Sequence, residues 1–248
     1  MALSFFVASK RISPTIPHAK NLQTMKQALF FLLLFSPVIA QKNYVFDYLL
    51  EYDFQLSENS EIQKRYMLTN SKDNTYDLLY WQSSVKDLNI FFSEDLEGIQ
   101  IRKTIPIREF FSNEKLFFNC NEFTKHRVRS IYDEKKYKFT IHNDSVMLTD
   151  TLKHYQMDIV SNKLKKKYEF GTSHYLVANE TQFHLPLMQF SETFDVRITS
   201  KSVPNEIAKE IYTINDFRHT KEYYYKLIVY LKIKKEVVIS DPCQLQNN

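Results

Sequence analysis

The sequence predicts a mainly β protein made of antiparallel strands, with at most one or two short helices. Three observations predict this fold class. Apolar and polar residues alternate along several segments, the chain contains 16 Tyr and 20 Phe, and Asn, Asp and Ser cluster between the alternating segments. Alternation with period two gives a strand one apolar face, aromatic residues favour strands, and short polar residues form turns. Strands at short intervals, without long helical patterns between them, indicate a β-rich domain.

The first half of the chain is expected to contain a strand, a hairpin and a short helix. Tyr44–Phe54 is apolar on both faces, as in a strand that is buried on both sides. Tyr66–Asn70 and Tyr76–Trp81 are strand-like, and the polar segment Ser71–Asn74 between them predicts a hairpin turn. Arg108–Asn113 is compatible with a short helix.

The second half is expected to contain further alternating strands. Tyr137–Ile141 and Val146–Leu148 flank the turn-like pair Asn143 and Asp144, which predicts a second hairpin. Phe194–Ile198 alternates in the same way and predicts another strand with one apolar face.

The segment Val203–Ile214 has two interpretations, because its apolar residues match both a helix that begins at Pro204 and a strand. Leu227–Ile233 alternates and predicts a strand near the end of the chain. An antiparallel chain of this size forms a sandwich, a closed barrel or a strongly curved sheet. The two-sided apolar character of Tyr44–Phe54 and Tyr223–Ile233 fits either a curved sheet with an apolar concave side or burial inside a sandwich.

Residues 25–40 are expected to form a cleaved secretory signal peptide. Lys26 supplies a positive charge, Ala28–Phe35 is an apolar run, and Val38–Ala40 provides a cleavage site. The apolar run is shorter than the roughly 20 residues of a membrane-spanning helix. Residues 1–24 are interpreted as an N-terminal extension upstream of the true start at Met25, and a transit peptide is the alternative, since residues 1–40 contain no Asp or Glu.

The expected mature chain, residues 41–248, has the length of a single β-rich domain. Four of the 33 Lys and Arg residues lie before residue 41, which leaves 29 basic residues against 29 acidic ones. Because nucleic-acid binding requires a net basic surface, no nucleic-acid partner is expected. Gln41, rather than a cysteine, follows the cleavage site, so a secreted or periplasmic protein is expected, without a lipid anchor or a remaining transmembrane span.

Glycine is nearly absent, and this excludes several classes of site. The chain contains only Gly98 and Gly171. A dinucleotide-binding loop, a P-loop and a nucleophile elbow each need closely spaced glycines. No cofactor is therefore expected.

No catalytic or metal-binding residue is assigned from the sequence. The six histidines after residue 40 lack both the helical i, i+4 spacing and the H-x-H spacing of a metal site. His142 and His154 flank the second predicted hairpin and could meet in space. The paired carboxylates lie in turn-like segments, as solvated loop charges do. We therefore expect no enzymatic activity, with a hydrolase whose active site is unrecognised as the alternative.

Two cysteines and two basic clusters are the remaining candidates. Cys120 and Cys243 either pair in an oxidising compartment or remain two separate thiols. The basic clusters suit contact with anionic lipid headgroups or acidic glycans, and the alternative is that lysines guard the end of a strand against aggregation. The first cluster comprises Lys163, Lys165, Lys166 and Lys167, and the second lies at Lys232–Lys235.

The expected export signal, a first strand that includes Tyr48–Phe54 and about ten further strands resemble bacterial secreted proteins of the GLPGLI type. The segment Ser202–Ile207 is similar to the motif that names this group, although it lacks the glycine. More distantly, the pattern resembles the LolA-like lipoprotein-carrier half-barrels. That resemblance implies a strongly curved antiparallel sheet, or open half-barrel, that holds acyl chains on an apolar concave side.

The favoured interpretation is an exported cell-envelope protein that binds an apolar or amphipathic ligand without catalysis. A lipid or a lipidated envelope protein is the expected partner. The aromatic content, the two-sided apolar strands and the lack of catalytic motifs support this interpretation. The alternatives are a secreted hydrolase and a structural or adhesive surface protein.

Overall fold

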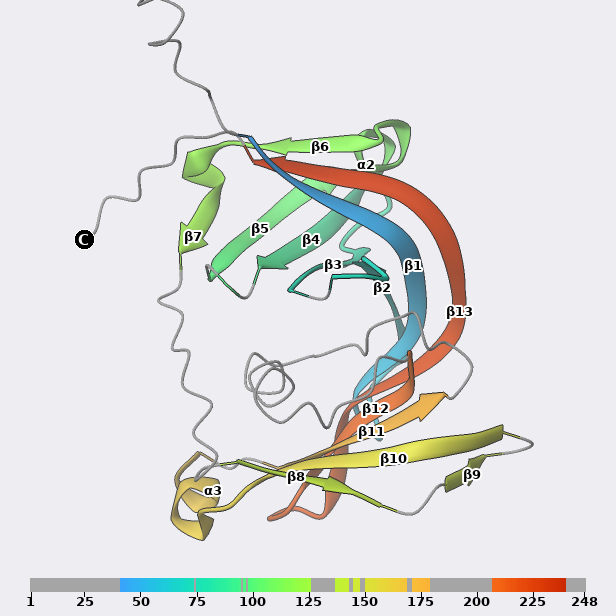
Figure 1. Ribbon diagram of the computed structural model, residues 1–248, viewed down its shortest axis with the longest axis vertical. Coiled ribbons are helices and arrows are strands. Elements are labelled where there is room, and N and C mark those ends of the chain that lie inside the picture. Colours follow the sequence, from blue (N-terminus) through green and yellow to red (C-terminus); the bar gives the residue numbers. More distant parts are fainter. Residues whose placement is uncertain are drawn as a thin grey trace, which may run out of the picture. The chain divides into compact units, whose positions relative to one another are not determined.

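The computed structural model describes most of the chain after residue 40 (Figure 1). The chain separates into two units, Met1–Ile39 and Ala40–Asn248, and every described residue belongs to the second. The expected leader and the strand expected at Phe194–Ile198 lie outside the described residues. The described residues are 41–73, 75–94, 96, 98–125, 137–142, 145–147, 150–168, 171–178 and 207–239.

Thirteen strands form one sheet, and this confirms the predicted fold class. The strands are β1 Lys42–Ser57, β2 Gln63–Thr69, β3 Tyr76–Gln82, β4 Asp87–Glu94, β5 Ile99–Pro106, β6 Lys115–Phe118, β7 Phe123–Lys125, β8 Tyr137–Ile141, β9 Ser145–Met147, β10 Asp150–Ile159, β11 Thr172–Ala178, β12 Ala208–Asn215 and β13 Thr220–Ile239. Eleven of them follow the order β7-β5-β4-β3-β2-β1-β13-β12-β11-β10-β8, while β6 pairs with β13 and β9 with β10. In the described part of the chain all pairings are antiparallel except that of β6 with β13. The sheet is open, since β7 and β8 end the two sides of this order.

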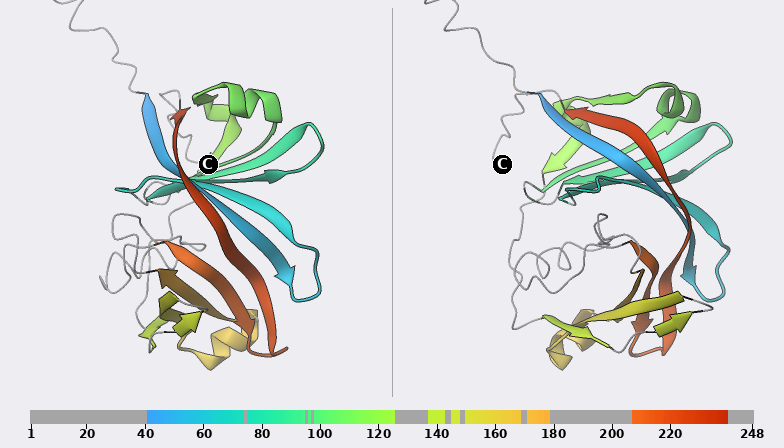
Figure 2. Two further views of the ribbon diagram at one scale, coloured as in Figure 1. Left: turned by 90° about the vertical axis from the view of Figure 1, so that its right-hand side faces the viewer. Right: turned by 45° about the vertical axis from the view of Figure 1, so that its right-hand side comes forward.

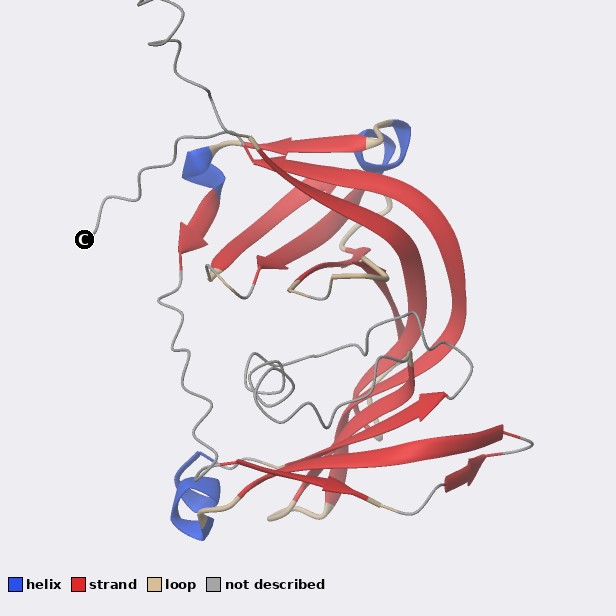
Figure 3. Cartoon of the chain, viewed as in Figure 1, coloured by secondary structure: helices blue, strands red, loops and turns tan. Residues whose placement is uncertain are grey.

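Helices are short in the described residues, as predicted (Figure 3). The α-helices are α2 Ile107–Ser112 and α3 Asn162–Tyr168, and η1 Cys120–Glu122 is a 3₁₀ turn. The helix expected at Arg108–Asn113 is therefore confirmed. Among the residues that the structure describes, no helix is long and apolar enough to cross a membrane.

The two longest strands, β1 and β13, form the middle of the sheet and set its curvature. They pair from Lys42 opposite Ile239 to Ser57 opposite Glu222. Both bend strongly along their length, as Figures 1 and 2 show. Their register shifts twice along this pairing, and extra residues of this kind bend a strand and increase its twist. The bend gives the sheet a concave side.

Three apolar clusters pack against the sheet in the described part of the chain, and two of them are large. The first lies against β3, β4 and β5, and includes Leu78 and Phe92, which are fully buried. The second lies on β1, β2 and β10–β13, and includes Leu50 and Met67. Because Leu68 belongs to the first cluster and Met67 to the second, β2 is apolar on both faces. The expectation of two apolar faces is wrong for Tyr44–Phe54, where buried residues such as Phe46 and Leu50 alternate with Asp47, Glu51 and Asp53.

The predicted elements of the first half agree with the structure. β2 and β3 form the hairpin expected around Ser71–Asn74, with Tyr66 opposite Tyr80. β1 contains the strand expected at Tyr44–Phe54. In the second half, the ambiguous segment Val203–Ile214 is a strand from Ala208 onward, so the helical interpretation is wrong for these residues.

The second predicted hairpin is wrong. β8 pairs with Tyr155–Ile159 of β10, and β9 pairs with Asp150–Leu152 of the same strand. β8 and β9 therefore follow each other along one edge of β10, instead of pairing with each other around Asn143 and Asp144. The physical reason is that a polar pair can interrupt a strand as well as reverse it, and alternation alone does not distinguish the two.

The expected apolar face of Leu227–Ile233 is also wrong. Val229 is 38% exposed and Leu231 is 51% exposed, as is Ile228 on the other side at 47%. β12 pairs with β13 only up to Lys226, and β6 only from Glu236. Among the described residues, the middle of β13 is therefore paired on the β1 side alone, which leaves both of its faces partly open.

Candidate functional site

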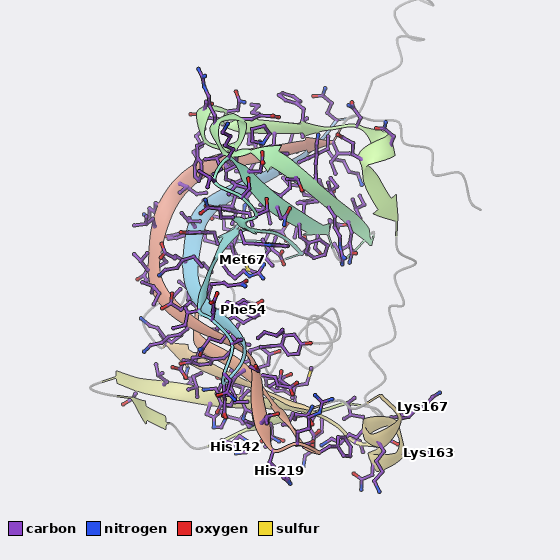
Figure 4. The ribbon with its side chains drawn as sticks, turned by 180° about the vertical axis from the view of Figure 1, so that it is seen from behind. Phe54, Met67, His142, Lys163, Lys167 and His219 are labelled. Atoms are coloured by element: carbon purple, nitrogen blue, oxygen red, sulfur yellow. The ribbon has the colours of Figure 1, made fainter. Side chains whose placement is uncertain are left out.

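One face of β1–β5 faces the inner side of the bend, and we call it the concave face. Figure 4 shows Phe54 and Met67 pointing to this side. The register places Leu50, Met67, Leu79, Phe91 and Arg102 opposite one another on five neighbouring strands. Side chains that are directly opposite in a sheet share a face. A row that is apolar on β1–β4 and ends in a cation on β5 thus crosses the concave face.

A pocket of about 460 Å³ lies over the β3, β4 and β5 part of this row, and Ile90 and Lys103 are among its lining residues. Leu79, Trp81 and Phe91 supply its apolar lining, and Asn89, Arg102 and Thr104 supply polar groups. These residues share the concave face because Trp81 is opposite Asn89, and Asn89 is opposite Thr104. Sequence reasoning missed this set, since its members come from three strands and alternate with the residues of the buried core.

Two arginines lie against the aromatic rings of the concave face. The Arg65 guanidinium is 4.8 Å from the centre of the Phe54 ring and 4.2 Å from that of Trp81. The Arg102 guanidinium is 4.7 Å from the centre of the Phe91 ring. Guanidinium groups stack favourably on aromatic faces. The concave face therefore combines an apolar surface with two cations.

β10–β12 carry a ladder of stacked histidine and tyrosine rings on the face opposite the second apolar cluster. His142 stacks on His154 with ring centres 4.6 Å apart, and His154 Nε2 lies 2.9 Å from His174 Nδ1. The His174 ring stacks on Tyr212 at 4.9 Å. The meeting of His142 and His154 in space is thus confirmed, although they do not flank a hairpin. Among the described residues, no group of three or more His, Cys, Asp or Glu side chains is arranged to hold a metal ion.

Burial lowers the pKa of two residues in this ladder, His174 and His154. For His174, burial has the largest effect, the positive charges of His154 and His142 add to it, and Asp216 and Asp158 oppose it, so that its pKa is about 4. Burial and the charge of His142 also lower the pKa of His154. His174 and His154 are therefore neutral at pH 7.

We expect acidification to destabilise the protein through His174. Its folded-state pKa of about 4 lies below the unfolded value of about 6.5, so its contribution to stability is complete above pH 6.5 and is lost as the pH falls toward 4. From pH 7 to pH 5 this loss is about 1–2 kcal/mol, after allowance for solvent screening of a partly exposed group. Urea unfolding at both pH values measures it. The His174→Gln variant should lose less stability over this interval than the wild type, and an equal loss in both would contradict the assignment.

The predicted basic cluster lies on α3, between β10 and β11, instead of at the end of a strand. Lys165 forms ion pairs with Asp158 and with Asp216, the latter at 2.7 Å. Burial alone would lower the pKa of Lys165, but the hydrogen bonds to these two carboxylates raise it. Lys163, Lys166 and Lys167 are exposed, and Figure 4 shows Lys163 and Lys167 at this end of the sheet. Contact of this cluster with an anionic surface stays a prediction.

The second basic cluster is partly structural. Lys235 is only 8% exposed, and its Nζ donates hydrogen bonds to the carbonyl oxygens of Phe110 and of Asn113, the latter at 2.7 Å. These carbonyls lie at the end of α2, where helix carbonyls lack partners within the helix. Lys234 forms an exposed ion pair with Glu114 at 3.1 Å.

The predicted disulfide between Cys120 and Cys243 stays a prediction. Cys120 begins the 3₁₀ turn η1, and Cys243 lies outside the described residues.

Comparisons with known proteins identify no family for this chain. No model of a protein family matches it. No curated protein matches its sequence.

Similar solved structures include two bacterial proteins. One is a candidate outer membrane lipoprotein-sorting protein domain from Vibrio parahaemolyticus, with 7% identity and a TM-score of 0.28, covering 77% of this chain and 85% of that one. The other is a DUF1329 family protein from Desulfovibrio piger, with 6% identity and a TM-score of 0.22, covering 84% of this chain and 92% of that one. At these scores the likeness carries no functional argument, so the proposals below rest on the residues of this chain.

Proposed function

We propose that this protein binds the apolar part of an amphipathic ligand, such as the acyl chain of a lipid or a lipidated protein, on its concave face. The observation that carries the proposal is the pocket of about 460 Å³ over Leu79, Trp81 and Phe91. Pockets of about 300–1,000 Å³ with aromatic and aliphatic linings are typical of small-molecule sites. A few polar groups beside such a lining, here Asn89 and Thr104, orient an amphipathic ligand.

The proposed setting is the cell envelope. The signal peptide expected at residues 25–40 supports export to the periplasm or beyond, and Gln41 at the expected cleavage site supports a mature protein without a lipid anchor. The mature chain, residues 41–248, would then act as one β-rich domain. A carrier or sensor that holds a ligand without changing it is the role we propose for that domain.

Trp81 provides a direct test, because it is the single tryptophan of the chain and lines the pocket. We expect the fluorescence of Trp81 to change in a saturable manner when residues 41–248 are titrated with 1-decanol, a neutral alkyl probe. The Phe91→Ser variant should bind decanol about ten- to hundredfold more weakly, since a lost apolar side-chain contact is worth roughly 1.5–3 kcal/mol.

The control for this experiment is Phe117→Ser. Phe117 lies on β6, is 63% exposed and does not line the pocket. This variant should bind decanol as the wild type does. No saturable response of the wild type to decanol, or equal weakening in both variants, would contradict alkyl-chain binding on the concave face.

A further inference from the structure

Arg65 on β2 is a half-buried cation held between two aromatic rings. Phe54 and Trp81 contact its guanidinium at 4.8 Å and 4.2 Å from their ring centres. Its Nη2 group donates a hydrogen bond to Gln63 Oε1 at 3.2 Å. Its Nε atom is buried and has no hydrogen-bond partner among the described residues. The guanidinium carries five N–H donors. Because Nε is buried, a ligand would bind the donors of the two Nη groups.

The acidic side chains near Arg65 belong to the opposite face of the sheet. Lys64, the preceding residue, forms ion pairs at 2.8 Å with Glu51 and with Asp53. Consecutive residues of a strand point to opposite faces. In the described part of the chain Arg65 itself has no carboxylate within ion-pair distance.

Even a partly buried cation is energetically unfavourable without a counter-ion. Burial lowers the pKa of the Arg65 guanidinium, because removing the charge from water disfavours the charged form. Proteins normally pair such charges or satisfy them with hydrogen bonds. An anion that reached Arg65 from the concave face would relieve the cost.

We propose that Arg65 binds the carboxylate of a single-chain fatty acid, whose alkyl chain lies over Trp81, Leu79 and Phe91. This inference rests on the proposed function and names the class of ligand. The planar guanidinium matches a carboxylate in a two-bond arrangement. A volume of about 460 Å³, at the lower end of the range for ligand pockets, suits one alkyl chain better than the two chains of a phospholipid.

Arg102, the other cation of the concave face, is less suited to hold the carboxylate. It is exposed, and charge pairs that are open to solvent contribute little. The half-buried Arg65 is screened less, so its interaction with an anion is stronger. Arg102 therefore serves as an internal comparison on the same face.

The test measures binding of decanoate and 1-decanol to residues 41–248 by isothermal titration calorimetry. We expect the wild type to bind decanoate about ten- to hundredfold more tightly than decanol, the range given by hydrogen bonds to a charged group. The Arg65→Gln variant should bind both probes with the affinity of decanol. Arg65→Lys, which keeps the charge but loses the planar fork, should fall between the wild type and Arg65→Gln.

Two controls separate this role from general charge effects. Lys64→Gln removes the same charge from the adjacent residue on the opposite face, and we expect it to leave the preference for decanoate unchanged. Arg102→Gln should reduce that preference less than threefold. A larger loss in Arg102→Gln than in Arg65→Gln would overturn the assignment of Arg65.

The outcomes for the wild type distinguish this inference from the proposed function. If the wild type bound decanoate and decanol with equal affinity, the anion site would be overturned, but alkyl-chain binding would not. This comparison uses the wild type alone, so it does not depend on whether a variant folds. Failure to bind either probe would overturn both proposals. Binding of a two-chain phospholipid in preference to decanoate would overturn the assignment of a single-chain ligand.

Discussion

Replacing Phe92 with alanine is expected to lower the free energy of unfolding by about 3–5 kcal/mol, as for other fully buried phenylalanines. Phe92 lies on β4 and has 0% exposure. Its ring contacts Tyr44 edge-on at 4.9 Å, and it joins a cluster with Leu78 and Ile101. This cluster ties β1 to β3, β4 and β5, so a cavity there weakens contacts between strands that are distant in sequence. Urea unfolding measures the change.

The adjacent residue provides a matched control. Phe91 lies on the concave face, is only partly buried and lines the pocket. Phe91→Ala removes the same number of atoms, yet we expect it to cost only about 1 kcal/mol, because less of its apolar surface is buried. A larger loss for Phe91→Ala than for Phe92→Ala would mean that the two faces of β4 are assigned the wrong way round.

Replacing Gly171 with alanine is expected to destabilise the protein by about 3 kcal/mol through a steric clash. Gly171 immediately precedes β11, and a Cβ atom there would lie 2.3 Å from the Ile214 carbonyl oxygen and 2.6 Å from Thr213 Cγ2. Since the first of these contacts is with backbone, β11 and β12 would have to separate. In a domain of this size such a loss lowers the melting temperature by roughly 6–12 °C, which calorimetry measures.

Gly98 is the natural comparison, since it is the only other glycine in the sequence. Its φ is 68°, in the left-handed region where glycine is favoured. Gly98→Ala should cost about 1–2 kcal/mol from backbone strain alone. A Gly171→Ala variant with the wild-type melting temperature would contradict the close approach of β11 and β12 at Gly171.

The sequence was sufficient to predict the strand-rich fold and its first hairpin. Tyr44–Phe54 carries apolar residues at every second position, and this pattern depends only on the periodicity of a strand. The hairpin at Ser71–Asn74 was predictable because its turn residues and both its strands are local in sequence. Local patterns of this kind predict a strand or a hairpin without any knowledge of the rest of the fold.

Pairings between distant segments were not predictable in the same way. β6 pairs in parallel with the end of β13, about 120 residues later, and no local pattern indicates it. The interruption between β8 and β9 has the composition of a turn, although both strands pair with β10. The alternation in the middle of β13 predicts a half-buried strand, yet this segment is exposed. Its burial depends on where β12 and β6 end, which the local sequence does not show.

The candidate site could not be predicted from the sequence for a similar reason. Arg65 occupies a concave-face position in a strand where Lys64 is also basic, so composition does not separate the two. Their difference arises from the neighbouring strands, which place Glu51 and Asp53 beside Lys64 but aromatic rings beside Arg65. Only the arrangement of the strands shows that one of the two cations lacks a carboxylate partner among the residues that the structure describes.

Native mass spectrometry of the protein purified from its own host, followed by solvent extraction, tests the central claim most directly. We expect a mature chain that begins at Gln41 and carries one fatty acid, which is released by the solvent. A protein that is free of ligand, and that takes up neither decanoate nor decanol when these are added, would contradict ligand binding on the concave face.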